Sequence, residues 1–122
     1  MGFEFEEVKE LVVGTWDVDK GTTISKGQLD KEQSIDINAF DGYIKVTKKE
    51  FKFLGGFGKE PTYKYRLTFD ENSAVDEKYY VNTIVDGVGP KKQGDVKILD
   101  DNTIIYTDYG FPYSLYLVKR TS

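Results

Sequence analysis

The sequence contains no cysteine and no histidine among its 122 residues. Without cysteine, the chain can form no disulfide, bind no iron–sulfur cluster through thiolates and offer no thiol nucleophile. Without histidine, it lacks the side chain that most often acts as a general base near neutral pH and most often binds transition metals. These two absences weigh against catalysis. We therefore predict no enzymatic activity, no catalytic residue, no metal site and no cofactor.

Long apolar runs and clustered positive charges are also missing. No stretch approaches the roughly 18 consecutive apolar residues of a membrane-spanning helix, and no basic segment followed by an apolar one marks a signal peptide. The net charge is -4, and the lysines are scattered, whereas a nucleic-acid-binding face needs clustered basic residues. We expect no membrane span and no nucleic-acid partner. The compartment stays unassigned, because a secreted protein whose signal had been removed would look the same.

Aromatic residues are what the sequence has in plenty. They make up 15% of the chain, with nine tyrosines, eight phenylalanines and a single tryptophan. Hydrophobic residues at 39% and charged residues at 31% are ordinary for a globular domain. The length fits one domain over residues 1–122 with one hydrophobic core.

The first segment, residues 3–12, is typical of a short amphipathic helix. Phe5, Val8 and Leu11 (or Val12) recur at spacings of three and four, with glutamates between them. A helix of about two to three turns is too short to be stable alone. We therefore expect it to dock on the rest of the domain through Phe5, Val8 and Leu11.

After Gly14 the pattern changes to the alternation of β-strands. The clearest example is residues 62–72, where Tyr63, Tyr65, Leu67 and Phe69 share one face. Strands are expected at 15–19, 34–38, 42–55 as a hairpin, 62–72, 78–87, 94–110 as a pair, and 111–121. Turn residues recur between them every eight to twelve residues or so. A meander of this kind forms a closed barrel or a sandwich.

A short helix leading into Gly14-Thr15-Trp16 on the first strand, with Arg120 near the end of the chain, resembles the lipocalin-like (calycin) barrels. In that family the first helix plugs one end of the barrel, the tryptophan lies on its floor, and a late arginine packs against the indole. The resemblance implies an all-β fold: a single antiparallel up-and-down β-barrel of about eight strands with a short N-terminal helix plugging one end. It also implies that Arg120 packs on Trp16.

Within that family the chain is most similar in length to the small bacterial lipocalin-like domains and to the fatty-acid-binding proteins. It lacks the cysteines and the later motifs of the secreted lipocalins. Residues 20–33 are polar and contain two glycines, so we expect no helical lid of the kind that fatty-acid-binding proteins carry after the first strand.

By the same resemblance, the expected function is binding of a small apolar or amphipathic molecule in the barrel mouth. Tyrosine suits such a pocket because it combines an apolar body with a polar tip. The candidate ligand-binding residues are Tyr63, Tyr65, Phe69, Tyr106 and Tyr113 on strand faces, and Phe57 in the glycine-rich loop 54–61. The alternative interpretation is that these rings simply fill the core.

A second hypothesis is a non-catalytic module that presents surface aromatics to a protein or a glycan. Its candidate contact residues are Phe57, Tyr109, Phe111 and Tyr113. In this hypothesis the partner is a protein or a glycan that these rings contact. On the strand 62–72, Lys64 and Arg66 alternate with the apolar residues and are expected to point outward; with the faces reversed they would form a site for a carboxylate. An enzyme would need a carboxylate or tyrosine of strongly shifted pKa in a cleft, and the sequence identifies no such group.

Overall fold

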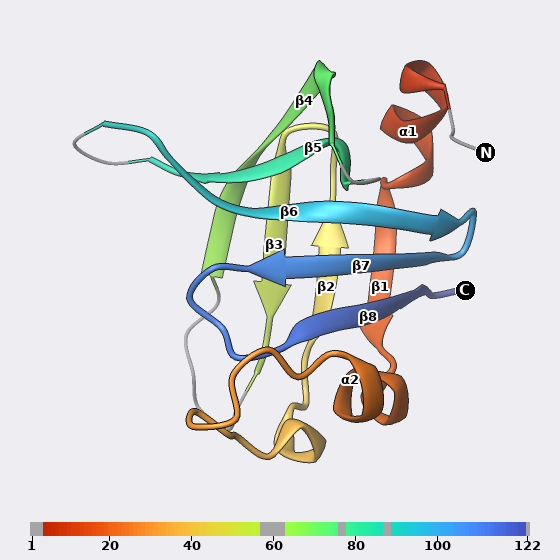
Figure 1. Ribbon diagram of the computed structural model, residues 1–122. Helices are drawn as coiled ribbons and strands as arrows, with labels where there is room; N and C mark the ends of the chain where they lie inside the picture. The colour runs from red at the N-terminus through yellow and green to blue at the C-terminus, as the bar shows by residue number, and fades with distance from the viewer. Residues whose placement is uncertain (1–3, 57–62, 76–77, 87–88, 122) are drawn as a thin grey trace.

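The computed structural model describes residues 4–56, 63–75, 78–86 and 89–121, with backbone alone for 71–75 and 78–80. Eight strands form a closed antiparallel barrel in which each strand pairs with its neighbour in sequence and β8 pairs with β1 (Figure 1). The predicted all-β up-and-down barrel with a short N-terminal helix is confirmed.

The elements follow one another along the chain with short connections, apart from the segment between β1 and β2. In order they are α1 (Phe5–Leu11), β1 (Gly14–Val18), α2 (Lys20–Lys26), the 3-10 turn η1 (Ile37–Ala39), β2 (Tyr43–Val46), β3 (Glu50–Leu54), β4 (Tyr63–Val75), β5 (Lys78–Val85), β6 (Lys91–Asp100), β7 (Thr103–Asp108) and β8 (Ser114–Lys119).

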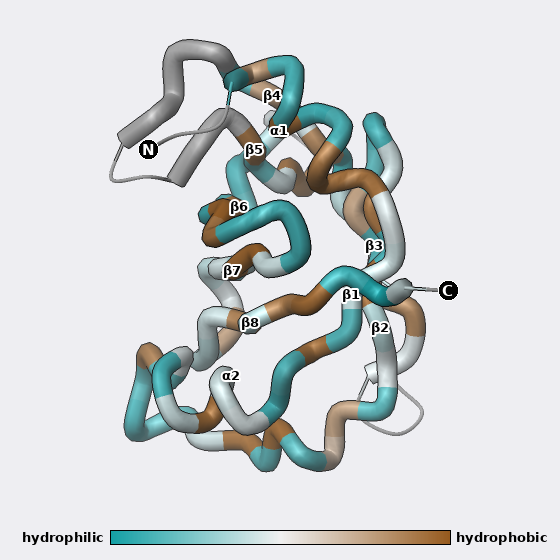
Figure 2. The backbone as a smooth tube through the Cα atoms, turned by 90° about the vertical axis from the view of Figure 1, so that its right-hand side faces the viewer, coloured by the Kyte–Doolittle hydropathy of each residue, from teal (hydrophilic) through white to brown (hydrophobic). Residues whose placement is uncertain are grey.

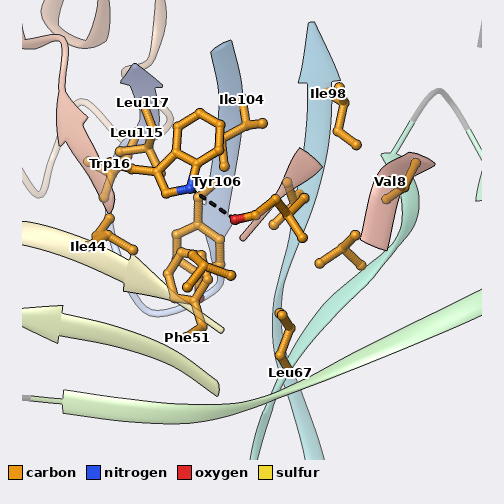
Figure 3. Close-up of a cluster of buried hydrophobic side chains, with 14 of the residues drawn as sticks. Val8, Trp16, Ile44, Phe51, Leu67, Ile98, Ile104, Tyr106, Leu115 and Leu117 are labelled. Atoms are coloured by element: carbon orange, nitrogen blue, oxygen red, sulfur yellow. Dashed lines mark hydrogen bonds between the residues drawn. The ribbon is translucent and has the colours of Figure 1, made fainter. Parts of the chain in front are cut away.

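Helix α1 lies at the end of the barrel where β1 begins (Figure 1). Val8 and the residue after the helix, Val12, are fully buried, while Phe5 and Leu11 are only half-buried. The helix therefore docks mainly through Val8 and Val12. The indole Nε1 of Trp16 donates a hydrogen bond of 3.0 Å to the carbonyl oxygen of Val12, drawn as the dashed line in Figure 3. This bond ties the helix to the barrel floor.

The interior is packed with side chains from alternate positions of the strands. Buried residues recur with a period of two along β7 and β8, and hydrophilic and hydrophobic residues are interspersed along the strands in Figure 2. The rings of Trp16, Phe51 and Tyr106 lie among aliphatic side chains in the middle of this core (Figure 3). The aliphatic residues of the core include Ile44, Leu67, Ile98, Ile104, Leu115 and Leu117.

The segment between β1 and β2 differs from expectation in two places. Residues 34–38 were expected to form a strand, but the chain makes the turn η1, in which the Asp36 side chain accepts a 3.0 Å bond from the backbone N–H of Asn38. Before it, the polar residues 20–26 form helix α2. Asp19 caps this helix by accepting from the backbone N–H and the hydroxyl of Thr22, as aspartate does at many helix starts.

Helix α2 and the residues after it lie across the end of the barrel opposite α1, as both Figure 1 and Figure 2 show. The backbone of Ser114 donates a 2.6 Å bond to the carbonyl of Gly27, and the Tyr113 hydroxyl donates to the carbonyl of Ile35. A Cβ on Gly27 would lie 2.2 Å from the carbonyl oxygen of Ser114. Glycine is therefore needed where this segment crosses β8.

Candidate functional site

A cavity of about 300 Å³ opens at the end of the barrel away from α1. It lies where β3 and β7 end and where β4 and β8 begin, and Phe40 from the segment before β2 closes one side. Its lining consists of Phe40, Phe53, Gly55, Gly56, Tyr63, Tyr65, Asp108, Gly110, Phe111 and Leu115. The volume is at the small end of the roughly 300–1,000 Å³ typical of small-molecule sites.

Asp108, the last residue of β7, brings a carboxylate to the wall of this cavity. Its side chain is on the inner face of the barrel, and the residue is only 7% exposed. One carboxylate oxygen, Oδ1, accepts bonds from the Gln93 side-chain amide at 2.7 Å and from the backbone N–H of Gly110 at 2.8 Å. The other, Oδ2, accepts from the Tyr106 hydroxyl at 2.9 Å. The carboxylate is therefore held in one orientation by neutral donors.

Behind Asp108 a short polar chain continues into the barrel. The Tyr106 hydroxyl lies 2.9 Å from the hydroxyl of Thr83, and both residues are fully buried. Burial first, and then the negative charge of Asp108, raise the pKa of Tyr106 well above its ordinary value. The phenol thus stays protonated and can act as a donor to the carboxylate. On β6, Gly94 leaves room for this hydroxyl, since a Cβ there would lie 2.8 Å from it.

Tyr65 is the titratable ring that faces both the cavity and Asp108. Burial first, and then the charge of Asp108 together with a side-chain hydrogen bond to it, raise the pKa of Tyr65 from 10.0 to about 12. Its ring packs edge-on against Phe53 with 6.0 Å between the centroids. Tyr65 therefore offers the cavity a neutral hydroxyl over the ordinary pH range.

The raised pKa of Tyr65 predicts a loss of stability in alkaline solution. The folded state keeps this proton while the unfolded chain releases it, so the contribution is complete below about pH 10 and is lost as the pH rises towards about 12. Urea unfolding should therefore show the wild type losing more stability than Tyr65→Phe between about pH 9 and about pH 11. The tyrosinate absorbance of wild type minus Tyr65→Phe should titrate near pH 12; titration near pH 10 would contradict the assignment.

The structure brings two of the sequence-predicted binding residues to the cavity, Tyr63 and Tyr65. Tyr63 is 49% exposed and stands on its rim. Tyr106 and Tyr113 are buried in the core, and the half-buried Phe69 packs against that core; none of the three is part of the lining. Phe57 lies outside the described residues.

Sequence reasoning missed Asp108, because its position before Tyr109-Gly110 is typical of a turn. The alternation Ile104, Tyr106, Asp108 does carry the signal: it places Asp108 on the inner face of β7. Phe40 and Phe111 were missed as lining residues because each joins the cavity from outside a strand.

Not all of the other predicted surface groups lie on the outer face: Tyr109 does, whereas Phe111 packs against the core and Tyr113 is buried in it. Tyr109 is 55% exposed, and its hydroxyl donates a 3.2 Å bond to Asp95. Phe111 is half-buried against the core, and Tyr113 is 6% exposed. Lys64 and Arg66 point outward as expected, where they form ion pairs with Glu50 and with Asp86, respectively.

The cation that packs on Trp16 is Lys119, and the expectation for Arg120 is wrong. Lys119 lies opposite Trp16 in the register of β1 and β8, with its Nζ 5.1 Å from the centre of the indole and 2.6 Å from the carbonyl oxygen of Leu11. Arg120 follows on the other face, where it forms an ion pair with Asp17 and stacks on Tyr43.

Gly14 explains why the Lys119 side chain can take this path. Its φ of +150° lies in a region that favours glycine, and a Cβ there would approach the Lys119 Cε to 3.3 Å. The Gly14 and Trp16 pair thus has a structural role at the junction of α1 and the barrel.

Among the described residues, no helix is long and apolar enough to cross a bilayer. Within the same part of the chain, no cluster of three or more Asp or Glu side chains is arranged to bind a metal ion. No protein-family profile, curated protein or solved structure matches the chain.

Proposed function

We propose that this chain is a lipocalin-like barrel that binds one small amphipathic molecule in the cavity at the barrel mouth. The observation that carries the proposal is the contrast between this cavity and the rest of the interior. Around Trp16 and Tyr106 the barrel is filled with side chains, whereas about 300 Å³ beside Tyr65 and Asp108 is open. Binding, rather than catalysis, is the role that this arrangement supports.

The lining indicates the kind of ligand. Aromatic and aliphatic side chains such as Phe40, Phe53 and Leu115 offer an apolar surface, and the Asp108 carboxylate and the Tyr65 hydroxyl are polar groups that can fix an orientation. A long acyl chain would have to displace the packed ring of Tyr106. We therefore expect a compact ligand with one polar end.

Titration with an amphipathic fluorescent dye tests the proposal. We expect saturable binding near one dye per chain, displaced by compact aromatic compounds and not by palmitate. Gly110→Leu should weaken binding by about tenfold or more, because a side chain at this position grows from the cavity wall beside Asp108. A Cβ at Gly110 makes only ordinary contacts, at 3.4 and 3.5 Å, so this variant is expected to fold.

Gly21→Leu is the matched control. It introduces the same side chain at an exposed position of α2 where a Cβ meets only the Asp19 carboxylate, at 3.9 Å. Its dye affinity should equal that of the wild type. Equal weakening by both substitutions, or no saturable dye binding by the wild type, would refute a binding site at the barrel mouth.

A further inference from the structure

The Asp108 carboxylate is a buried negative charge without a positive partner in the described part of the chain. The donors that hold it are the Gln93 amide, the Gly110 backbone and the phenols of Tyr106 and Tyr65, all of them neutral. The ion pairs of the described residues involve other carboxylates. Burial of an uncompensated charge is costly, so a cation at this site would be stabilising.

The cavity in front of Asp108 is walled by aromatic rings. Phe53 lies 6.0 Å from Tyr65 and 5.9 Å from the buried Tyr106 between ring centroids, and Phe40 and Phe111 are also part of the lining. The face of such a ring attracts a positive charge, and the attraction grows when water is excluded. No lysine or arginine is among the described residues that line this cavity.

A carboxylate at one wall and rings at the others form the combination that recognises an organic ammonium ion. We propose that the cavity selects a small organic cation, an ammonium group on a compact apolar body, with the ammonium beside Asp108 and the body against Phe53 and Phe111. This rests on the proposed function and adds to it the charge of the ligand. A neutral or anionic ligand would leave the carboxylate without a counter-charge, and an anion would be repelled by it.

Three probes of nearly equal size and different charge test this selectivity: 2-phenylethylammonium, 2-phenylethanol and 3-phenylpropionate. Each is titrated against the dye-loaded wild-type protein at neutral pH. We expect the ammonium compound to displace the dye with an affinity about tenfold or more above that of the alcohol, and the carboxylate compound to be the weakest. The comparison needs no variant, so it holds whatever a substitution does to folding.

Asp108→Asn then assigns the selectivity to its residue. Asparagine keeps the shape and most hydrogen bonds but removes the charge, so the preference for the ammonium over the alcohol should disappear while dye binding persists. The matched control is Asp101→Asn, in the exposed turn between β6 and β7 at the other end of the barrel. This variant should keep the wild-type preference.

The outcomes separate the two proposals. If the dye binds and the three probes compete equally, or only the alcohol or the carboxylate compound competes, the cavity binds ligands but the preference for a cation is refuted. A preference that survives in Asp108→Asn also refutes the role of this carboxylate. If neither the dye nor any probe binds, the proposed function itself fails.

Discussion

Replacing Trp16 with alanine is expected to lower the free energy of unfolding by about 3–5 kcal/mol, the usual cost of removing a large buried ring. Trp16 is fully buried, its indole donates to the carbonyl of Val12, and Lys119 packs over its face. The substitution therefore leaves a void in the core and also loosens the attachment of α1. A loss this large is a sizeable fraction of the stability of a small domain.

Urea unfolding followed by far-ultraviolet circular dichroism measures this loss, since the variant has no tryptophan fluorescence. Trp16→Phe is the graded control: it keeps a ring but removes the bond to Val12, so its loss should be clearly smaller. Tyr43→Ala removes a half-buried ring from the outer face of β2 and should cost less than Trp16→Ala. If Trp16→Ala costs under about 1 kcal/mol, the indole is not a core residue and the described packing is wrong.

The barrel could be predicted because strand alternation is a local property of the chain. Trp16 and Tyr106 are buried inside the barrel as expected, and the hairpin expected over residues 42–55 appears as β2 and β3. The prediction was wrong between β1 and β2, where aspartate side chains bond to the backbone and favour turns and helix starts over a strand. The Asp36 side chain caps the turn η1 by accepting from the backbone N–H of Asn38. The Asp19 side chain caps α2 in the same way, although that segment is rich in residues with low helix propensity.

Alternation gives the face of a residue but not its depth along the barrel. Tyr65 and Tyr106 both point inward, yet only Tyr65 lies near the open end and lines the cavity. Which of them does so depends on the stagger between distant strands, which the sequence pattern does not specify. The same limit explains why the wrong residue was expected on Trp16. The resemblance predicted that a cation packs on the indole, but the register of β8 against β1 determines that this cation is Lys119 and not Arg120.

Asp108 was missed for a different reason. A carboxylate before a Tyr-Gly step is usually exposed to solvent, because aspartate is common in turns. That preference predicted a solvated turn residue, although the inward alternation along β7 points the other way. Its burial is compensated by Gln93 and Tyr106, which donate hydrogen bonds to its two carboxylate oxygens. Such a group is found by asking which polar residue continues an inward face to the end of a strand.

Asp108→Ala is expected to lower the free energy of unfolding by about 3 kcal/mol, because bonds to charged groups contribute about 1.5–3 kcal/mol each and several donors lose their acceptor together. Tyr106 keeps its contact with Thr83, but the amide of Gln93 and the backbone N–H of Gly110 lose theirs. Urea unfolding at neutral pH measures the loss.

Asp108→Asn should cost about 1 kcal/mol or less, because the amide oxygen can still accept from Gln93 and Gly110. Its amide N–H can donate to the Tyr106 oxygen, and the Tyr106 hydroxyl can in turn donate to Thr83. The difference in unfolding free energy between Asp108→Ala and Asp108→Asn measures what the hydrogen bonds at this position contribute. The ligand preference of Asp108→Asn measures what the negative charge contributes. Equal losses in both variants would mean that the fold itself depends on the negative charge, and the carboxylate would then have a structural reason to be there without any ligand.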